Sequence, residues 1–248
     1  MRNFQKLTLA LLAVASLTLS SCLHILEEVT FRNNGSGSYK MLIDMSEVKG
    51  MMDMMKGMAN DSTGAAEGLG GAGAGEGDMS EMGKGLSDAA NSLNKVQGIT
   101  NVKQTNDTTN FQFGYTFDFS DIGALNRALK AINKEKYQSE SGDVFRFTGK
   151  SFERLGAGDI GEEMKKAMAK GNDEAGEDTD MAMDMVKNFF GDMSYKQIYH
   201  FPDRAIKKQN NTLGEISEDK HTLTITLKPF DEEQQKKKMS VATAAKLK

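Results

Sequence analysis

The chain contains a single cysteine, Cys22, and its position decides what chemistry the thiol could do. One cysteine cannot close a disulfide within the chain or build a thiolate zinc site. Cys22 comes after an apolar run, residues 7–19, which basic residues precede and small residues follow. Such a run is typical of a signal peptide and is too short for a typical membrane-spanning helix. We therefore expect a signal peptide over residues 1–21, with cleavage between Ser21 and Cys22.

The residues at this site, Leu19-Ser20-Ser21-Cys22, resemble the lipobox of bacterial lipoproteins, which is a branched aliphatic residue, two small residues and a cysteine. In that family the cysteine receives a diacylglycerol on sulfur and becomes the new N-terminus. The resemblance implies that Cys22 is a lipid anchor bearing several acyl chains, such as palmitate, and several chains hold a protein far better than one. The alternative is a free thiol beside an ordinary cleavage site.

The residue after the cysteine is Leu23 rather than aspartate. In lipoproteins of Gram-negative bacteria this resembles the pattern of an outer-membrane destination. For a Gram-negative source we therefore expect attachment to the outer membrane, on its periplasmic face. Two tripeptides, Asp61-Ser62-Thr63 and Asp107-Thr108-Thr109, resemble sites that are O-glycosylated in some Bacteroidetes, and they imply a source in that group.

Methionine is unusually frequent, with 17 residues among 248, and most of the clustered ones fall in two predicted helices. Their spacing follows the i, i+3, i+4, i+7 pattern of one apolar helix face. Methionine side chains pack adaptably, and faces rich in them suit promiscuous apolar ligands. The pattern predicts packing or an adaptable apolar groove, whose candidate residues are Met51, Met54, Met55, Met58, Met181 and Met185.

Thioethers are also soft ligands that suit Cu(I). An alternative function is therefore a periplasmic copper-handling protein that binds Cu(I) through Met51, Met52, Met54 and Met55. The helical spacing of these residues favours packing over copper.

No other group of residues indicates catalysis or a cofactor. The three histidines, His24, His200 and His221, have no metal-binding or catalytic partner nearby in the sequence, and we expect the last two to be half-exposed strand residues. Motifs of the GxSxG, HExxH or phosphate-loop type are absent from the sequence. The acidic run at 173–180 lacks the residue order of an EF-hand. We therefore expect a protein that is not an enzyme and that binds no cofactor, although polar groups assembled from distant strands would escape this test.

The charge of the chain argues against a nucleic-acid partner. The formal net charge is −4, and removal of Arg2 and Lys6 with the signal peptide makes the mature chain more acidic. Electrostatic binding to nucleic acid needs a basic patch, and the only run of three basic residues, 236–238, follows acidic residues. The expected partners are the membrane, through the N-terminal lipid, and an apolar ligand or an envelope protein.

Most of the mature chain shows alternating strand patterns with hairpin signals. An Asn-Gly turn at residues 33–37 separates two such runs, because Asn and Gly tolerate the positive φ of a tight hairpin. Five aromatic residues alternate from Phe111 to Phe119, which would place all five rings on one face of a strand. The predicted strands cover residues 25–32, 38–45, 99–104, 110–119, 144–148, 151–155, 195–209 and 221–228.

Helical patterns lie between these strands, and two segments have neither pattern. Residues 60–78 are glycine-rich and predict a flexible, disordered loop, while residues 171–180 predict an exposed acidic linker. The C-terminal segment from Phe230 is predicted to be helical, with fraying at its end. The predicted helices are 46–59, 79–96, 121–135, 159–170, one that starts at residue 179 or 180, and 230 onward. The expected fold is one α+β domain over residues 22–248, a mainly antiparallel sheet with helices packed on one side.

Two segments resemble the LppM-like lipoprotein domains. Residues 29–46 (VTFRNNGSGSYKMLIDMS) are similar to the strand, turn and strand that open such domains. Residues 199–211 and 217–227 are similar to their later pattern of Phe-Pro, an isoleucine, asparagines and a final strand, although Asp203 replaces the usual glycine and the last strand lacks tryptophan. The family is lipid-anchored and of unknown function. The sequence thus predicts a membrane-anchored, non-enzymatic lipoprotein that binds a lipid, another apolar ligand or a partner protein.

Overall fold

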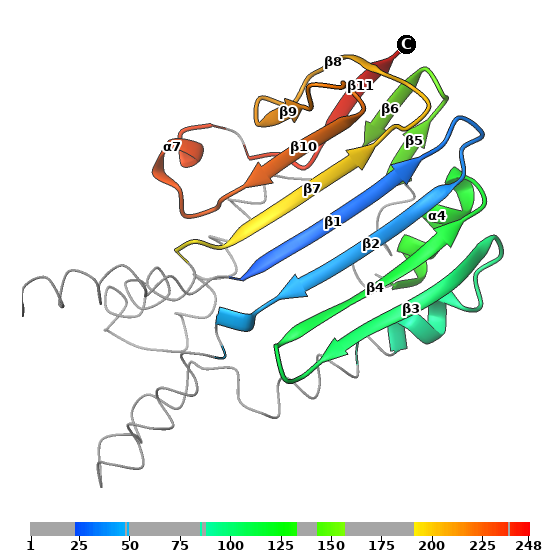
Figure 1. Ribbon diagram of the computed structural model, residues 1–248, viewed down its shortest axis with the longest axis vertical. Helices are drawn as coiled ribbons and strands as arrows, with labels where there is room; N and C mark the ends of the chain where they lie inside the picture. Colours follow the sequence, from blue (N-terminus) through cyan, green and yellow to red (C-terminus); the bar gives the residue numbers. More distant parts are fainter. Residues whose placement is uncertain are drawn as a thin grey trace, which may run out of the picture.

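The computed structural model describes residues 23–47, 49, 85, 88–132, 143–156, 191–237 and 239–248. Its largest element is a seven-stranded sheet with the strand order β3-β4-β2-β1-β7-β10-β9. Figure 1 shows these strands side by side in one twisted layer. The strands are β1 (His24–Phe31), β2 (Gly37–Asp44), β3 (Ile99–Asp107), β4 (Gln112–Phe119), β7 (Ser194–His200), β9 (Gly214–Ile216) and β10 (Thr222–Leu227).

Strand β1 lies in the middle of this sheet and has neighbours of opposite direction. On one side it pairs antiparallel with β2, and on the other it pairs parallel with β7, from His24 opposite Ser194 to Thr30 opposite His200. The remaining pairs of this sheet are antiparallel. The sheet is therefore mainly antiparallel, as expected, and one parallel pair at its centre makes it mixed.

The β1–β2 hairpin forms where the Asn-Gly signal predicted it. Gly35 has a φ of 81°, and the N–H of Arg32 donates to the carbonyl of Ser36 at 2.8 Å. The side chain of Asn34 accepts from the N–H of Ser36 at 3.0 Å. These bonds fix the loop length, and the loop length fixes the β1–β2 register.

Strand β4 places its aromatic residues on the covered face of the sheet. Phe113, Tyr115, Phe117 and Phe119 are buried, as their alternation predicted. Phe111 differs, because it precedes the strand in the β3–β4 turn and has a φ of 52°. The turn, and not the strand, therefore determines where the fifth ring lies.

A second sheet has four strands in the order β5-β6-β11-β8. Its strands are β5 (Phe145–Phe147), β6 (Ser151–Arg154), β8 (Ile206–Gln209) and β11 (Thr243–Leu247). Strand β11 lies inside this sheet, and its residues 243–247 had been expected to continue a helix and fray. The C-terminal helix itself, α7 (Glu232–Gln235), is only four residues long. Pairing with β6 and β8 overrides the helical preference of the alanine-rich segment.

The second sheet and helix α4 (Ile122–Ile132) share one hydrophobic core with the large sheet. Figure 1 shows α4, β5 and β6 behind the seven-stranded layer. Phe152 of β6 lies 5.2 Å from Phe31 and 4.7 Å from Tyr199, measured between ring centroids. Among the described residues, a second sheet therefore shares the face of the large sheet that had been expected to carry helices alone.

Helix α4 was predicted from its apolar face, and the structure confirms it over residues 122–132. Its buried side chains include Leu125 and Leu129. Asn126 is buried on the same helix and accepts from the N–H groups of Val144 and Phe145 at 3.0 and 2.9 Å. Its amide donates to the carbonyl of Phe145 at 2.9 Å. One side chain thus fastens the helix to the first strand of the second sheet.

Several predicted segments lie outside the described residues. The glycine-rich loop at 60–78, the acidic linker at 171–180 and the predicted helices at 159–170 and from residue 180 are among them. Of the two earlier predicted helices, the structure describes residues 46, 47, 49, 85 and 88–96. The described residues up to 93 are helical, whereas residues 94–96 form a turn, so the second helix ends earlier than predicted.

Candidate functional site

The residues that the sequence singled out for lipid attachment and ligand binding lie outside the described part of the chain. Cys22, with Ser21 before it, immediately precedes the first described residue, Leu23. The apolar-groove and copper hypotheses therefore stay predictions. Their residues outside the described ranges are Met51, Met52, Met54, Met55, Met58, Met181 and Met185.

The three histidines form no common site: His24 starts β1, whereas His200 ends β7 and lies close to His221, which precedes β10, and each ring contacts a nearby polar group. The His24 ring lies 2.7 Å from the hydroxyl of Ser194, and the His221 ring lies 2.8 Å from a backbone carbonyl. His200 has its Nε2 at 2.9 Å from the carboxylate of Glu28. His200 and His221 are partly exposed, and no group of three or more His, Cys, Asp or Glu side chains suited to a metal occurs among the described residues.

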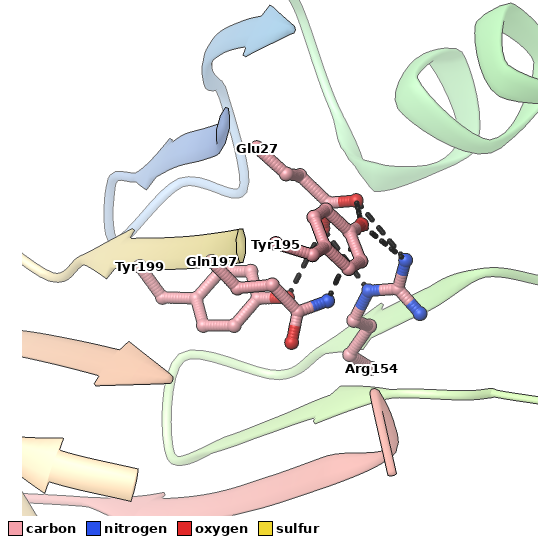
Figure 2. A network of polar contacts seen from close by, with 5 residues as sticks. All are labelled: Glu27, Arg154, Tyr195, Gln197 and Tyr199. Carbon is pink, nitrogen blue, oxygen red and sulfur yellow. Dashed lines mark hydrogen bonds and ion pairs between the residues drawn. The ribbon is translucent and has the colours of Figure 1, made fainter. Parts of the chain in front are cut away.

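A polar cluster that the sequence reasoning missed lies inside the core, between the two sheets. Its centre is the carboxylate of Glu27, which is 3% exposed. Arg154 donates to both carboxylate oxygens at 3.0 Å, and the hydroxyls of Tyr195 and Tyr199 donate at 2.6 and 3.0 Å. Figure 2 shows these side chains together with Gln197. We call this set of five residues the Glu27 cluster.

The parallel pairing of β1 and β7 assembles the cluster. In that register Glu27 lies opposite Gln197, so Tyr195 and Tyr199 stand two residues to either side on the same face of the sheet. Arg154 comes from the end of β6 in the second sheet, and its guanidinium also lies 5.8 Å from the centre of the Phe145 ring. The cluster therefore joins the sheets by polar bonds inside an aromatic core.

The surroundings keep Glu27 ionised and the tyrosines neutral. Burial raises the pKa of the Glu27 carboxyl, but the charge of Arg154 and the hydrogen bonds from Arg154 and the tyrosines outweigh it and leave the pKa lowered. Burial and the Glu27 charge raise the pKa of both Tyr195 and Tyr199. At neutral pH the carboxylate thus faces a guanidinium and two hydroxyl donors, a complementary arrangement for a buried charge.

This arrangement suits a structural role better than acid–base catalysis. A general base needs a free acceptor and a pKa near the working pH, whereas four donors already occupy the Glu27 oxygens and its pKa is lowered. Arg154 is equally engaged, since it also donates to the Tyr195 hydroxyl at 3.2 Å. The bonds within the cluster therefore hold the two sheets in one relative position.

One atom of the cluster has an unused hydrogen-bonding capacity. Gln197 is 0% exposed, and its amide nitrogen lies 3.5 Å from the Tyr195 hydroxyl, a long hydrogen bond. Among the described residues, its Oε1 is the buried side-chain oxygen or nitrogen without a partner. Figure 2 shows this oxygen pointing away from the carboxylate. A buried acceptor without a partner costs free energy, so the Gln197 side chain lowers the stability of the folded protein.

A local signal for part of this cluster exists in the sequence. Glu27 has the same parity as Ile25, Val29 and Phe31, so an acid stands among the inward-facing residues of the first strand. An acid at such a position predicts a buried partner of opposite charge. The identity of that partner, Arg154, depends on the packing of the second sheet and has no local signal.

Comparisons with known proteins give one distant neighbour. No protein-family model and no curated protein sequence matches the chain. Among solved structures, the chain is similar to the folded domain of the LppM protein of Mycobacterium tuberculosis, determined by NMR. The TM-score is 0.39 with 14% sequence identity, and the match covers 90% of this chain and 87% of that one. The resemblance of the sequence to LppM-like domains is thus accompanied by a weak structural resemblance.

None of the described helices is both long and apolar enough to span a membrane. The described chain begins at Leu23, directly after the residue expected to carry lipid.

Proposed function

We propose that the protein is a lipid-anchored lipoprotein of the cell envelope with a binding, non-enzymatic role. One observation carries the proposal: the central strand of the large sheet, β1, starts at His24, two residues after Cys22. An extended residue spans at most about 3.5 Å, so the backbone of Cys22 lies within about 7 Å of the sheet. A lipid on Cys22 would hold the folded domain directly at the membrane surface, with no flexible tether between them.

The start of β1 is firmly built into the sheet, which supports this role. The N–H of Ser194 donates to the carbonyl of Leu23 at 3.0 Å, so pairing with β7 extends to the first described residue. β2 pairs along the whole of the other side of β1. Any pull on Cys22 would therefore be transmitted to the middle of the domain.

The ligand that fits this position is a lipid or another apolar molecule of the envelope. The Glu27 cluster supports binding over catalysis, because its carboxylate and guanidinium are already paired with each other. The alternative ligand is a partner protein of the same membrane, and native mass spectrometry distinguishes the two. For a Gram-negative source, the membrane would be the outer membrane and the face would be periplasmic, because Leu23 follows the cysteine.

Mass spectrometry of the N-terminal peptide tests the anchor. Trypsin should release residues 22–32, and we expect this peptide to carry three acyl chains and to appear in the membrane fraction. The matched control is Cys22→Ser, which should remove the acyl mass and the membrane attachment that depends on it. Recovery of an unmodified Cys22 peptide from wild-type cells would contradict the proposal.

Native mass spectrometry of the mature protein in mild detergent tests ligand binding. We expect non-covalent lipid adducts in addition to the covalent acyl mass. A protein that carries only its covalent chains, and takes up no added phospholipid, would instead act by binding a partner protein.

A further inference from the structure

A small group of apolar side chains lies apart from the main core, at one end of the large sheet. The main core, which the two sheets share, contains none of its members. Met45 and Phe113 are its buried members, and three partly buried side chains pack against them. We call the group the end cluster, and it consists of Leu23, Ile43, Met45, Phe111 and Phe113.

The end cluster forms where three strand ends meet. In the register of the sheet, His24 lies opposite Asp44, and Asp44 lies opposite Gln112. Leu23, Met45 and Phe111 each stand one residue beyond these positions, and the N–H of Met45 donates to the carbonyl of Phe111 at 2.9 Å. Figure 1 shows the start of β1, the end of β2 and the start of β4 at the same end of the sheet.

Phe111 has an unusual conformation for an aromatic residue. Its φ of 52° lies in the left-handed region, which side chains other than glycine, asparagine and aspartate rarely adopt. The carboxylate of Asp107 holds the preceding turn by accepting from the N–H groups of Thr109 and Asn110 at 3.0 and 2.9 Å. The turn therefore keeps a partly exposed phenyl ring at the hairpin tip, against the local preference of the backbone.

The described charges beside the end cluster have both signs: the charges of His24 and Lys49 help to lower the pKa of Asp44 and Asp107, respectively, so this end has no strong net charge of one sign. Asp44 accepts from the side chain of Gln112 at 2.8 Å and from the N–H of Ser46 at 2.9 Å. Asp44 and Asp107 are both acidic and already hydrogen bonded in their turns. Contact of this end with a membrane would depend on apolar side chains, and it would not weaken as salt is added.

We propose that the end cluster is a membrane-contact surface, in which Leu23 and Phe111 enter the headgroup region of the bilayer that holds the acyl chains of Cys22. The inference rests on the proposed lipidation, because Leu23 is the residue directly after the anchor. It also uses the position of Phe111, which the β4–β2 pairing holds beside the end of β2 and whose apolar ring suits burial at the boundary between headgroups and acyl chains. The occupant of this surface is a phospholipid bilayer.

The absence of tryptophan from the chain allows a direct test. Phe111→Trp would provide the single indole of the full-length protein, reconstituted in phosphatidylcholine vesicles that contain brominated lipid. We expect a blue-shifted emission that brominated lipid quenches and that salt leaves unchanged. Thr109→Trp, at the exposed tip of the same turn, gives a second probe if the first variant does not fold.

Ile216→Trp is the matched control, because Ile216 is an exposed apolar residue near the opposite end of the sheet. The eight residues of β1 put the two ends about 23 Å apart. Emission from this variant should stay unquenched. Equal quenching of the variants at positions 111 and 216, or none in either 111 or 109, would overturn the proposal even where the acyl mass on Cys22 is found.

The two proposals fail in different ways. If mass spectrometry finds Cys22 unmodified, the lipoprotein proposal fails, and the thiol of the same full-length chain can be coupled to a maleimide phospholipid. The quenching experiment then still decides whether the end cluster contacts the bilayer. Quenching at position 111 but not at 216 would support the contact surface in both cases.

Discussion

The carboxylate of Glu27 and the guanidinium of Arg154 form an ion pair with two N–O distances of 3.0 Å, although 127 residues separate them in the chain. The pair lies between two sheets, and both side chains are at most 10% exposed. A buried pair contributes little net stability over an apolar pair, but loss of one partner is costly.

Arg154→Met should destabilise the protein by about 3–5 kcal/mol, because it leaves the Glu27 charge buried without a cation. The double variant Glu27→Met/Arg154→Met should lose less than the sum of the two single variants. Urea unfolding followed by circular dichroism measures the free energy of unfolding of each variant. The exposed pair Arg146–Glu153, at 3.8 Å, is the control, and its removal should cost less than about 1 kcal/mol. Additive losses at Glu27 and Arg154 would contradict the coupling.

Acid should weaken the protein through Glu27. Its pKa in the fold lies below the ordinary value of 4.5, so the stabilisation is complete above that pH and is lost as the pH falls through the folded pKa. Glu27→Gln should therefore flatten the fall of unfolding free energy below about pH 4.5. The control is Asp219→Asn: hydrogen bonds from Ser217 and His221 also lower the pKa of this carboxyl, but it is fully exposed and screened by solvent, so its removal should change the pH profile less. An unchanged pH profile in Glu27→Gln would refute this assignment.

Gln197→Met should raise stability by about 1 kcal/mol, because it removes a buried acceptor that has no partner. The volume of the side chain changes little, and the lost bond to Tyr195 is long, at 3.5 Å. Thermal unfolding of the variant and the wild type provides the comparison. A loss of stability would mean that the Gln197 oxygen accepts a hydrogen bond in solution.

Asn126→Leu should cost about 3 kcal/mol or more, because it leaves two buried N–H groups and a carbonyl of the β5 segment unpaired. Lys130→Ala on the same helix is the control, since Lys130 makes only an exposed ion pair at 3.7 Å with Asp143. The denaturant concentration at the midpoint of unfolding measures the stability of both variants. Similar small losses in the two variants would show that Asn126 does not fasten α4 to the second sheet.

Truncation after residue 241 should prevent stable folding, because β11 joins β6 to β8 within the second sheet. Lys246→Ala changes an exposed side chain of the same strand and should have little effect. The measurement compares the protease resistance of the truncated chain with that of Lys246→Ala. A truncated chain that resists protease like the full chain would contradict the position of β11.

Hairpins and alternating strands could be predicted from the sequence because their signals are local. The Asn34-Gly35 turn determines the β1–β2 register, and the alternation from Phe113 to Phe119 identifies the buried face of β4. The apolar face of α4 could be predicted in the same way. In each case the residues that form the element also carry the pattern that identifies it.

β5, β6 and β8 fall within predicted strands, but their assembly with β11 into a second sheet escaped prediction because the signal for β11 is not local. Residues 243–247 are rich in alanine and lysine, which favour helix, and only the open edges of β6 and β8 make them a strand. The Glu27 cluster escaped for a similar reason. The acid at position 27 was visible, but the parallel register with Gln197 and the approach of Arg154 require the complete fold.

The parallel pairing of β1 and β7 has a consequence for how the protein is made. Residues of β1 leave the ribosome first, and their partners on β7 follow about 170 residues later. At ordinary rates of synthesis this interval is on the order of ten seconds, during which one edge of the future central strand has no partner. An unpaired strand edge can pair with another chain, so we expect less aggregation when folding is delayed until β7 has been made.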